Sequence, residues 1–152
     1  MVEPERYDLS YTLIRNIQDV FDESPEDFHG QTETPAANHL FDVDKESENM
    51  NKEDGSLFNH LLDKLMYLSK RERPDIQTYV SFLCTLVQYP DKDDWNKLQK
   101  TIRYIEVTRW LPLTLEADVT MIIKWWIESL YGVHMDCQVH TGGAISIRKG
   151  NP

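Results

Sequence analysis

The sequence has little of what stabilises secreted or membrane-embedded proteins. Its two cysteines, Cys84 and Cys137, are too few for a disulfide framework or a zinc site. No apolar run approaches the roughly 18 residues of a membrane span. The acidic start MVEPERYDLS lacks the apolar core of a signal peptide, and no Asn-x-Ser/Thr glycosylation acceptor occurs. These absences predict an intracellular protein of the cytoplasm or nucleus, with no membrane partner.

Positive charge is also scarce, because 26 acidic residues outnumber 16 Lys and Arg and give a formal net charge of −10. A balance of this kind normally argues against a nucleic-acid partner. The acidity is concentrated in residues 1–55, which hold 15 acidic and 4 basic residues. Residues 56–152 hold 11 acidic and 12 basic residues, so this part of the chain is compatible with a nucleic-acid surface.

Residues 1–55 are predicted to form an acidic N-terminal arm made of one helix and a connector. Apolar residues at near-helical spacing indicate the helix over 8–21. Residues 22–55 then combine prolines, glycines and many acids, a composition typical of an extended connector.

Three amphipathic segments joined by very short turns follow the connector. They span residues 56–73, 74–89 and 92–108. Each carries an apolar stripe at helical spacing, with Ser56 as the expected cap of the first helix and Asp91 as that of the third. Residues 56–108 therefore predict a compact antiparallel three-helix bundle.

The periodicity changes after Arg109, where three short segments have strand character. Residues 111–117 and 142–150 alternate apolar and polar side chains, and residues 121–129 are rich in β-branched and aromatic residues. We expect the last two segments to pair as a hairpin. The predicted fold class is α+β with helix dominant: a three-helix bundle followed by a small, incomplete β-sheet over 109–152.

The strongest candidate binding residues are Lys70, Arg71 and Arg73, which gather at the end of the first bundle helix. They could contact a phosphate backbone, or they could simply complement the negative end of the helix dipole. Both interpretations stay open at this point.

Weaker candidates lie in the strand region. Trp125 and Trp126 could stack on bases or lie in a core, and the Thr141-Gly142-Gly143 segment could cradle a phosphate or open a strand. His134 and His140 match no common zinc spacing, so surface positions are the expectation for both. Glu128 ends the apolar stretch MIIKWWI and is either a solvent-facing strand end or a ligand for a charged group.

Several motifs in a fixed order resemble a known family. They are TPAANHLFDV, LFNHLLDKLMYLSKRERPDIQTYVSFL, PDKDDWNKLQKTIRYI, LPLTLEAD, IKWW and VHMDCQVHTGGAISIRKG. In this order they resemble the polymerase polyprotein of copia-type LTR retrotransposons. The resembling part runs from the thumb and connection of the reverse transcriptase into the start of the RNase H domain. It covers about residues 10–150, and its most specific element is Lys-Arg-x-Arg-Pro-Asp-Ile followed by Trp-x-x-Leu-x-x-x-x-Arg-Tyr.

The resemblance implies RNA-directed DNA synthesis and RNase H cleavage in the intact family, with Mg²⁺ as cofactor. The paired aspartates of the polymerase turn have no counterpart, because Asp93-Asp94 lies at a predicted helix start. Glu128 occupies the place of the first RNase H aspartate, one methylene longer than the family's metal ligand. The family's other carboxylates would follow residue 152, and one carboxylate cannot hold two Mg²⁺ ions.

We therefore expect a truncated fragment of a copia-type polyprotein that is catalytically inactive alone and binds no cofactor. Its partners would be an RNA:DNA hybrid or the remaining polyprotein domains. The alternative is a small, non-enzymatic helical interaction module that binds nucleic acid or protein.

Overall fold

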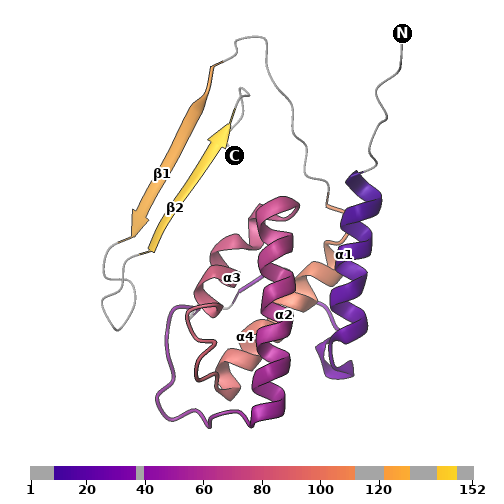
Figure 1. The fold of residues 1–152 in the computed structure, drawn as a ribbon, viewed down its shortest axis with the longest axis vertical. Helices are drawn as coiled ribbons and strands as arrows, with labels where there is room; N and C mark the ends of the chain where they lie inside the picture. The colour runs from indigo at the N-terminus through magenta and orange to yellow at the C-terminus, as the bar shows by residue number, and fades with distance from the viewer. Residues whose placement is uncertain (1–8, 37–39, 112–121, 131–139, 147–152) are drawn as a thin grey trace. The chain divides into compact units, whose positions relative to one another are not determined.

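The structure, a computed structural model, describes residues 9–36, 40–111, 122–130 and 140–146. The elements in chain order are α1 (Leu9–Glu23), the 3₁₀ helix η1 (Glu26–Phe28), α2 (Lys52–Arg71), the 3₁₀ helix η2 (Pro74–Ile76), α3 (Gln77–Leu83), α4 (Lys92–Val107), β1 (Lys124–Leu130) and β2 (His140–Ser146) (Figure 1). The fold is helix-dominant, as predicted. The chain divides into a helical unit, residues 1–40 with 44–112, and a hairpin unit, residues 41–43 with 113–152.

Helix α1 belongs to the helical unit and runs antiparallel to α2. Near its middle, the Asn16 amide donates to the carboxylate of Glu72, just beyond the end of α2. At its C-terminal end, Glu23 pairs with Lys64 in the middle of α2. The sequence placed this helix in a separate N-terminal arm. In the structure, α1 is instead part of the helical unit, because its apolar face with Ile17 and Val20 is buried in the helical core.

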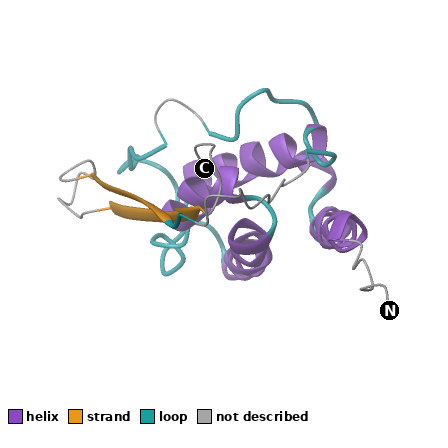
Figure 2. Ribbon diagram, turned by 90° about the horizontal axis from the view of Figure 1, so that it is seen from above, coloured by secondary structure: helices purple, strands orange, loops and turns teal. Residues whose placement is uncertain are grey.

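Helices α2 and α4 have corresponding ends close together. The Met50 N–H, just before α2, donates to the Pro90 carbonyl at 3.1 Å, and Pro90 precedes α4. At the other end, the Arg73 guanidinium donates to Thr108, the C-cap of α4. Viewed from above, α1 and α2 are seen nearly end-on, and another helix lies lengthwise beside them (Figure 2). The core between these helices is apolar and includes Phe28, Phe58, Leu61, Leu65, Leu68, Ile76, Val80, Leu83, Leu98, Ile102 and Ile105.

Two helix boundaries differ from the predicted ones for local reasons. Helix α2 begins after Asn51, whose side chain accepts from the Asp54 N–H at 2.8 Å, so Ser56 is not its cap. Helix α3 ends at Leu83, six residues earlier than expected, where the Thr85 N–H and hydroxyl both donate to the Phe82 carbonyl. These hydrogen bonds between residues three apart satisfy backbone groups at the two helix ends, and they set the ends at other residues than the apolar periodicity predicts.

The predicted cap of α4 is confirmed. Asp91 accepts from the Asp94 N–H at 2.9 Å, and the Asp94 carboxylate accepts from the Asp91 N–H at 3.2 Å. This reciprocal capping box satisfies two backbone donors that the helix itself leaves without partners.

In the hairpin unit, β1 and β2 pair antiparallel, which confirms the predicted hairpin. The register sets Trp125 opposite Ile145 and Glu128 opposite Gly142. Trp125, Ile127 and Ile145 are exposed. The predicted strand over 111–117 lies outside the described residues beyond Leu111. Across the part of the chain that the structure describes, no helix has the length and apolar composition that a membrane span requires.

We predict that Ile17→Ala lowers the free energy of unfolding of the helical unit by about 2–4 kcal/mol, because a fully buried branched side chain leaves a cavity. Gln18→Ala, on the exposed side of α1, is the control and should change it by less than about 0.5 kcal/mol. Chemical denaturation followed by helical circular dichroism gives both values. Equal effects would show that α1 does not share the core.

Candidate functional site

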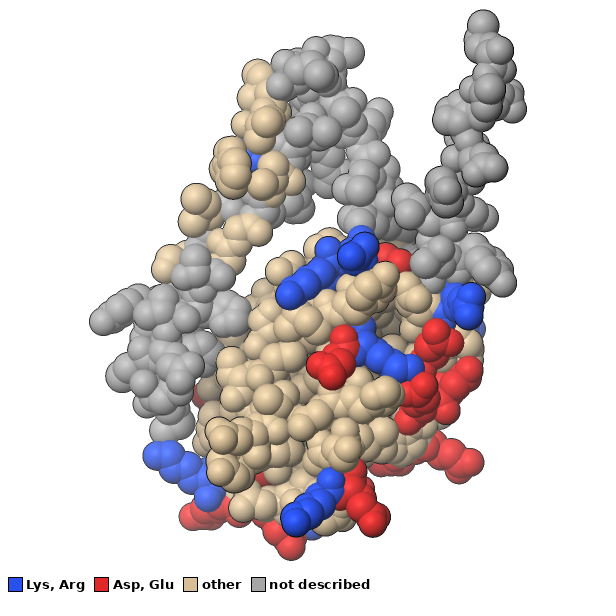
Figure 3. Space-filling view, in the orientation of Figure 1, with Lys and Arg blue, Asp and Glu red and all other residues tan. Residues whose placement is uncertain are grey.

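Lys70 and Arg71 lie in the last turn of α2 and are exposed. The Arg71 guanidinium stands 5.0 Å from the centre of the Tyr67 ring, one turn earlier on the same helix. Among the described residues, no carboxylate is within ion-pair distance of either cation. Figure 3 shows blue side chains at this upper end of the helical unit, whereas most of the red ones lie on its lower and right-hand sides.

The structure corrects the prediction that Arg73 binds nucleic acid, because its side chain is only 1% exposed. Its Nε and Nη2 donate to the two carboxylate oxygens of Asp75 at 2.9 and 2.8 Å. Its Nη1 donates to the Thr108 carbonyl at 3.1 Å and its Nη2 to the Thr108 hydroxyl at 2.7 Å. Four of the donors of the guanidinium are thus used inside the protein, and a phosphate has no access to it.

Tyr104 completes this network around the buried Arg73 guanidinium. Its hydroxyl donates to Asp75 at 3.1 Å, and its ring lies 5.5 Å from the Arg73 guanidinium carbon. Burial of the Asp75 carboxyl acts to raise its pKa, but the hydrogen bonds and charge of Arg73 outweigh burial, and the pKa is lowered. Asp75 therefore stays ionised at neutral pH and neutralises Arg73.

The network brings two further residues, which the sequence analysis did not select, to the basic end of α2. Arg109 and Trp110 follow Thr108 directly, and both are exposed. The Arg109 guanidinium lies 5.5 Å from the centre of the Trp110 ring. The sequence does contain a signal for these two residues, since a basic residue stands beside an aromatic one directly after a helix. The sequence analysis ends the helical bundle at Thr108 and assigns both residues to the strand region. We call Lys70, Arg71, Arg109 and Trp110 the basic end.

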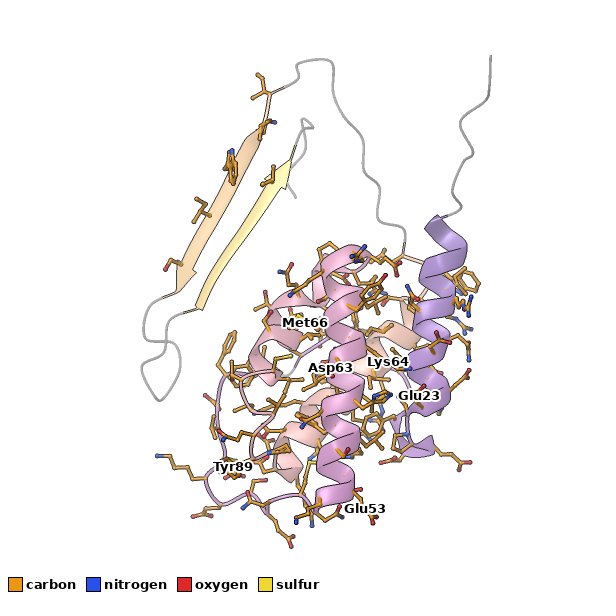
Figure 4. The ribbon with its side chains drawn as sticks, in the orientation of Figure 1. Glu23, Glu53, Asp63, Lys64, Met66 and Tyr89 are labelled. Carbon is orange, nitrogen blue, oxygen red and sulfur yellow. The ribbon has the colours of Figure 1, made fainter. Side chains whose placement is uncertain are left out.

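A shallow groove of about 290 Å³ lies between α1 and α2. Figure 4 shows Lys64 of α2 reaching toward Glu23 of α1 beside this groove. The Lys64 ammonium is 2.7 Å from the Glu23 carboxylate, and His60 pairs with the same carboxylate. Three of the polar side chains that line the groove are engaged by neighbouring carboxylates: Asn16 by Glu72, and His60 and Lys64 by Glu23. The lining residues of the groove are Asn16, Asp19, His60, Asp63, Lys64 and Tyr67.

Glu128 lies in the middle of β1, with its backbone opposite Gly142 of β2. It is the one carboxylate in the described strands, since β1 reads KWWIESL and β2 reads HTGGAIS. A site for two Mg²⁺ ions needs several converging carboxylates, so the described strands do not fit that metal pair.

The other candidate residues of the strand region do not form a site with Glu128 in the described strands, or they lie outside the described residues. Gly142 and Gly143 are inside β2 and not at a turn before it, and His140 opens this strand. Trp125 is 67% exposed. His134 and Cys137 are outside the described residues.

Asp91, Asp93 and Asp94 form a group of three carboxylates at the start of α4, with oxygens within 4.8 Å of one another. Asp91 and Asp94 cap the helix, and Asp93 pairs with the buried Lys97 ammonium at 2.8 Å. Burial raises the pKa of the Asp94 carboxyl to about 6, opposed by the hydrogen bond from the Asp91 N–H. These contacts give the group a structural role as a helix start, as expected for Asp93-Asp94 from the sequence.

Comparisons with protein-family models, with curated proteins and with solved structures gave no match.

We predict that Arg73→Lys lowers the free energy of unfolding by about 2 kcal/mol, because lysine cannot span Asp75 and Thr108 with a planar fork. Arg71→Lys makes the same change at an exposed site two residues away and should cost less than about 0.5 kcal/mol. Urea denaturation of both variants measures the difference. If the two variants matched, the buried network would not hold this end of the molecule.

We predict that Asp94 makes the helical unit more stable as the pH falls from 7 to 5. The raised pKa means that the folded state binds a proton near pH 6, whereas the unfolded carboxyl binds it only near its ordinary value of 3.8. The charged form therefore destabilises the fold above pH 6. Asp94→Asn should lose this dependence, and its stability relative to wild type should be about 1 kcal/mol greater at pH 7 than at pH 5.

Denaturant titrations at several pH values measure this difference, with the exposed Glu33→Gln as the control. A pH profile of Asp94→Asn that coincided with wild type would contradict the assignment of the raised pKa to Asp94.

Proposed function

We propose that this chain is a non-catalytic segment of a copia-type retrotransposon polymerase polyprotein whose helical unit binds the backbone of nucleic acid at the basic end. The observation that carries the binding proposal is the position of three exposed cations, Lys70, Arg71 and Arg109, at one end of the helical unit. They come from the ends of two different helices, and the Arg73–Thr108 hydrogen bonds join these ends. The polyprotein assignment rests on the order of motifs in the sequence.

The chemistry of the basic end suits phosphate. Arg and Lys side chains donate hydrogen bonds to phosphate oxygens, and each contact releases condensed counterions. The ligand chosen for the test is an RNA:DNA hybrid, the substrate that the family resemblance implies.

The proposed segment is non-catalytic because the described strands offer one carboxylate, Glu128, where two-metal cleavage requires several. The carboxylates Asp93 and Asp94 are engaged at the start of α4 and do not lie in the hairpin unit.

A second candidate function is the binding of a protein partner. It is favoured by the exposed apolar side chains of the hairpin, Trp125, Ile127 and Ile145, and by the net charge of −10. Absence of any binding to nucleic acid at low salt would leave this second candidate.

We predict that the chain binds an RNA:DNA hybrid with an affinity that falls as salt rises. Replacing Lys70 and Arg71 together by Ala should weaken binding and reduce the slope of log affinity against log salt by about 1–2, because each phosphate contact contributes about 0.7–0.9 to the slope. The measurement is fluorescence anisotropy of a labelled hybrid over a series of salt concentrations.

The matched control is Lys45→Ala with Lys52→Ala, which removes the same charge from exposed positions in the connector and at the start of α2. It should keep the wild-type slope. An equal loss in both double variants would mean that net charge, and not the basic end, governs binding. In the same samples, Mg²⁺ or Mn²⁺ should leave the hybrid uncut, and cleavage abolished by Glu128→Gln would contradict a non-catalytic segment.

A further inference from the structure

The two residues after Thr108, the C-cap of α4, are held in a defined turn. Thr108 accepts from Arg73 through both its carbonyl and its hydroxyl, and the Leu111 N–H donates to the same carbonyl at 2.9 Å. Arg109 and Trp110 lie inside this turn. Their backbone is therefore fixed against the buried network and does not simply trail from the helix.

Trp110 is exposed at this fixed position, with 67% of its surface accessible. A tryptophan normally buries most of its large apolar surface, so a fixed and exposed indole is costly to leave in water. The Arg109 guanidinium over its ring covers only part of it.

The same end carries a second pair of this kind, because the Arg71 guanidinium lies over the half-exposed Tyr67 ring. Both pairs are tied to Arg73: Arg71 precedes it by two residues in the chain, and Arg109 follows Thr108, which Arg73 hydrogen-bonds. Cations near exposed ring faces are the combination that contacts phosphates and bases together.

We infer that the basic end binds single-stranded nucleic acid, with Trp110 stacking on an unpaired base while Lys70, Arg71 and Arg109 contact neighbouring phosphates. This inference rests on the proposed function and specifies its ligand. An unpaired strand is required because the faces of bases inside a duplex are already stacked on each other. A single strand can turn one base face onto the indole while its backbone passes over the cations.

The test compares a 24-nucleotide single-stranded oligothymidine with a blunt, GC-rich DNA duplex of 12 base pairs, which carries nearly the same number of phosphates and stays double-stranded. Wild type should bind the single strand about tenfold more tightly than the duplex. Trp110→Ala should lose this preference, a loss of about tenfold for the single strand, and keep the salt slope of wild type. Trp110→Phe should restore part of the preference, because phenylalanine retains a ring face.

The Lys70→Ala and Arg71→Ala double variant provides the opposite pattern. It should weaken both ligands and reduce the salt slope, while the preference for the single strand remains. Tryptophan fluorescence gives an independent readout: the single strand should quench wild type, and this quenching should be absent from Trp110→Phe, which retains Trp95, Trp125 and Trp126. This readout holds even if Trp110→Ala fails to fold.

Equal affinity of wild type for the two ligands, or an unchanged preference in Trp110→Ala, would overturn the inference and leave the proposed binding of a hybrid intact. Quenching that persists in Trp110→Phe would also overturn it. Loss of hybrid binding in wild type itself at low salt would instead overturn the proposed function, so the two failures are distinguishable.

Discussion

The hydrogen bonds of the buried Arg73 guanidinium hold together the C-terminal ends of α2 and α4, and the arrangement of this end of the helical unit depends on them. A buried charge is stable only when it is neutralised and its donors are satisfied. Asp75 supplies the charge and two acceptors, and Thr108 supplies the other two acceptors from the end of α4. Because Thr108 lies 35 residues after Arg73 in the chain, satisfying this one side chain fixes where α4 ends relative to α2. The exposed residues Arg71 and Arg109 are neighbours in the chain of Arg73 and Thr108, so the bonds between Arg73 and Thr108 also hold them at the same end of the helical unit.

The polarity of the helices explains how a chain with a net charge of −10 has a basic end. Glu53 and Asp54 lie in the first turn of α2, and Asp93 and Asp94 in that of α4. Lys70 and Arg71 lie in the last turn of α2, and Arg109 follows the end of α4. Helices of 20 and 16 residues separate their ends by about 30 and 24 Å. These separations exceed the screening length of roughly 8–10 Å at physiological salt. The connector adds to this separation of acidic from basic ends, because its Glu48 pairs with Lys92 and so lies at the start of α4, away from the basic end.

The sequence predicted the dominance of helix and the positions of α1, α2 and α4, because their signals are local periodicities. It failed where a contact between distant segments decides the outcome. The position of Arg73 shows this most clearly. In the sequence, Lys70, Arg71 and Arg73 are alike as basic residues near a helix end. In the structure, the helix ends at Arg71 and the Arg73 side chain is buried. Asp75, two residues later, was a visible partner, whereas Thr108 could be paired with Arg73 only in three dimensions. For the same reason Trp110 could not be assigned to the end of α2 from the sequence.

Counting charges at the basic end shows why an aromatic contact matters there. Lys70, Arg71 and Arg109 contribute three positive charges, and Asp75 cancels Arg73. The C-terminal ends of α2 and α4 each contribute about −0.5 charge, and the Glu72 carboxylate contributes a full negative charge. The local excess is therefore only about one positive charge. Such an excess, largely screened beyond about 10 Å, gives weak attraction to any polyanion. A base stacked on a fixed indole adds about 1–3 kcal/mol that salt does not screen, which is comparable with or larger than that electrostatic attraction. The proposed preference for a single strand therefore rests on the exposed ring and not on the number of cations.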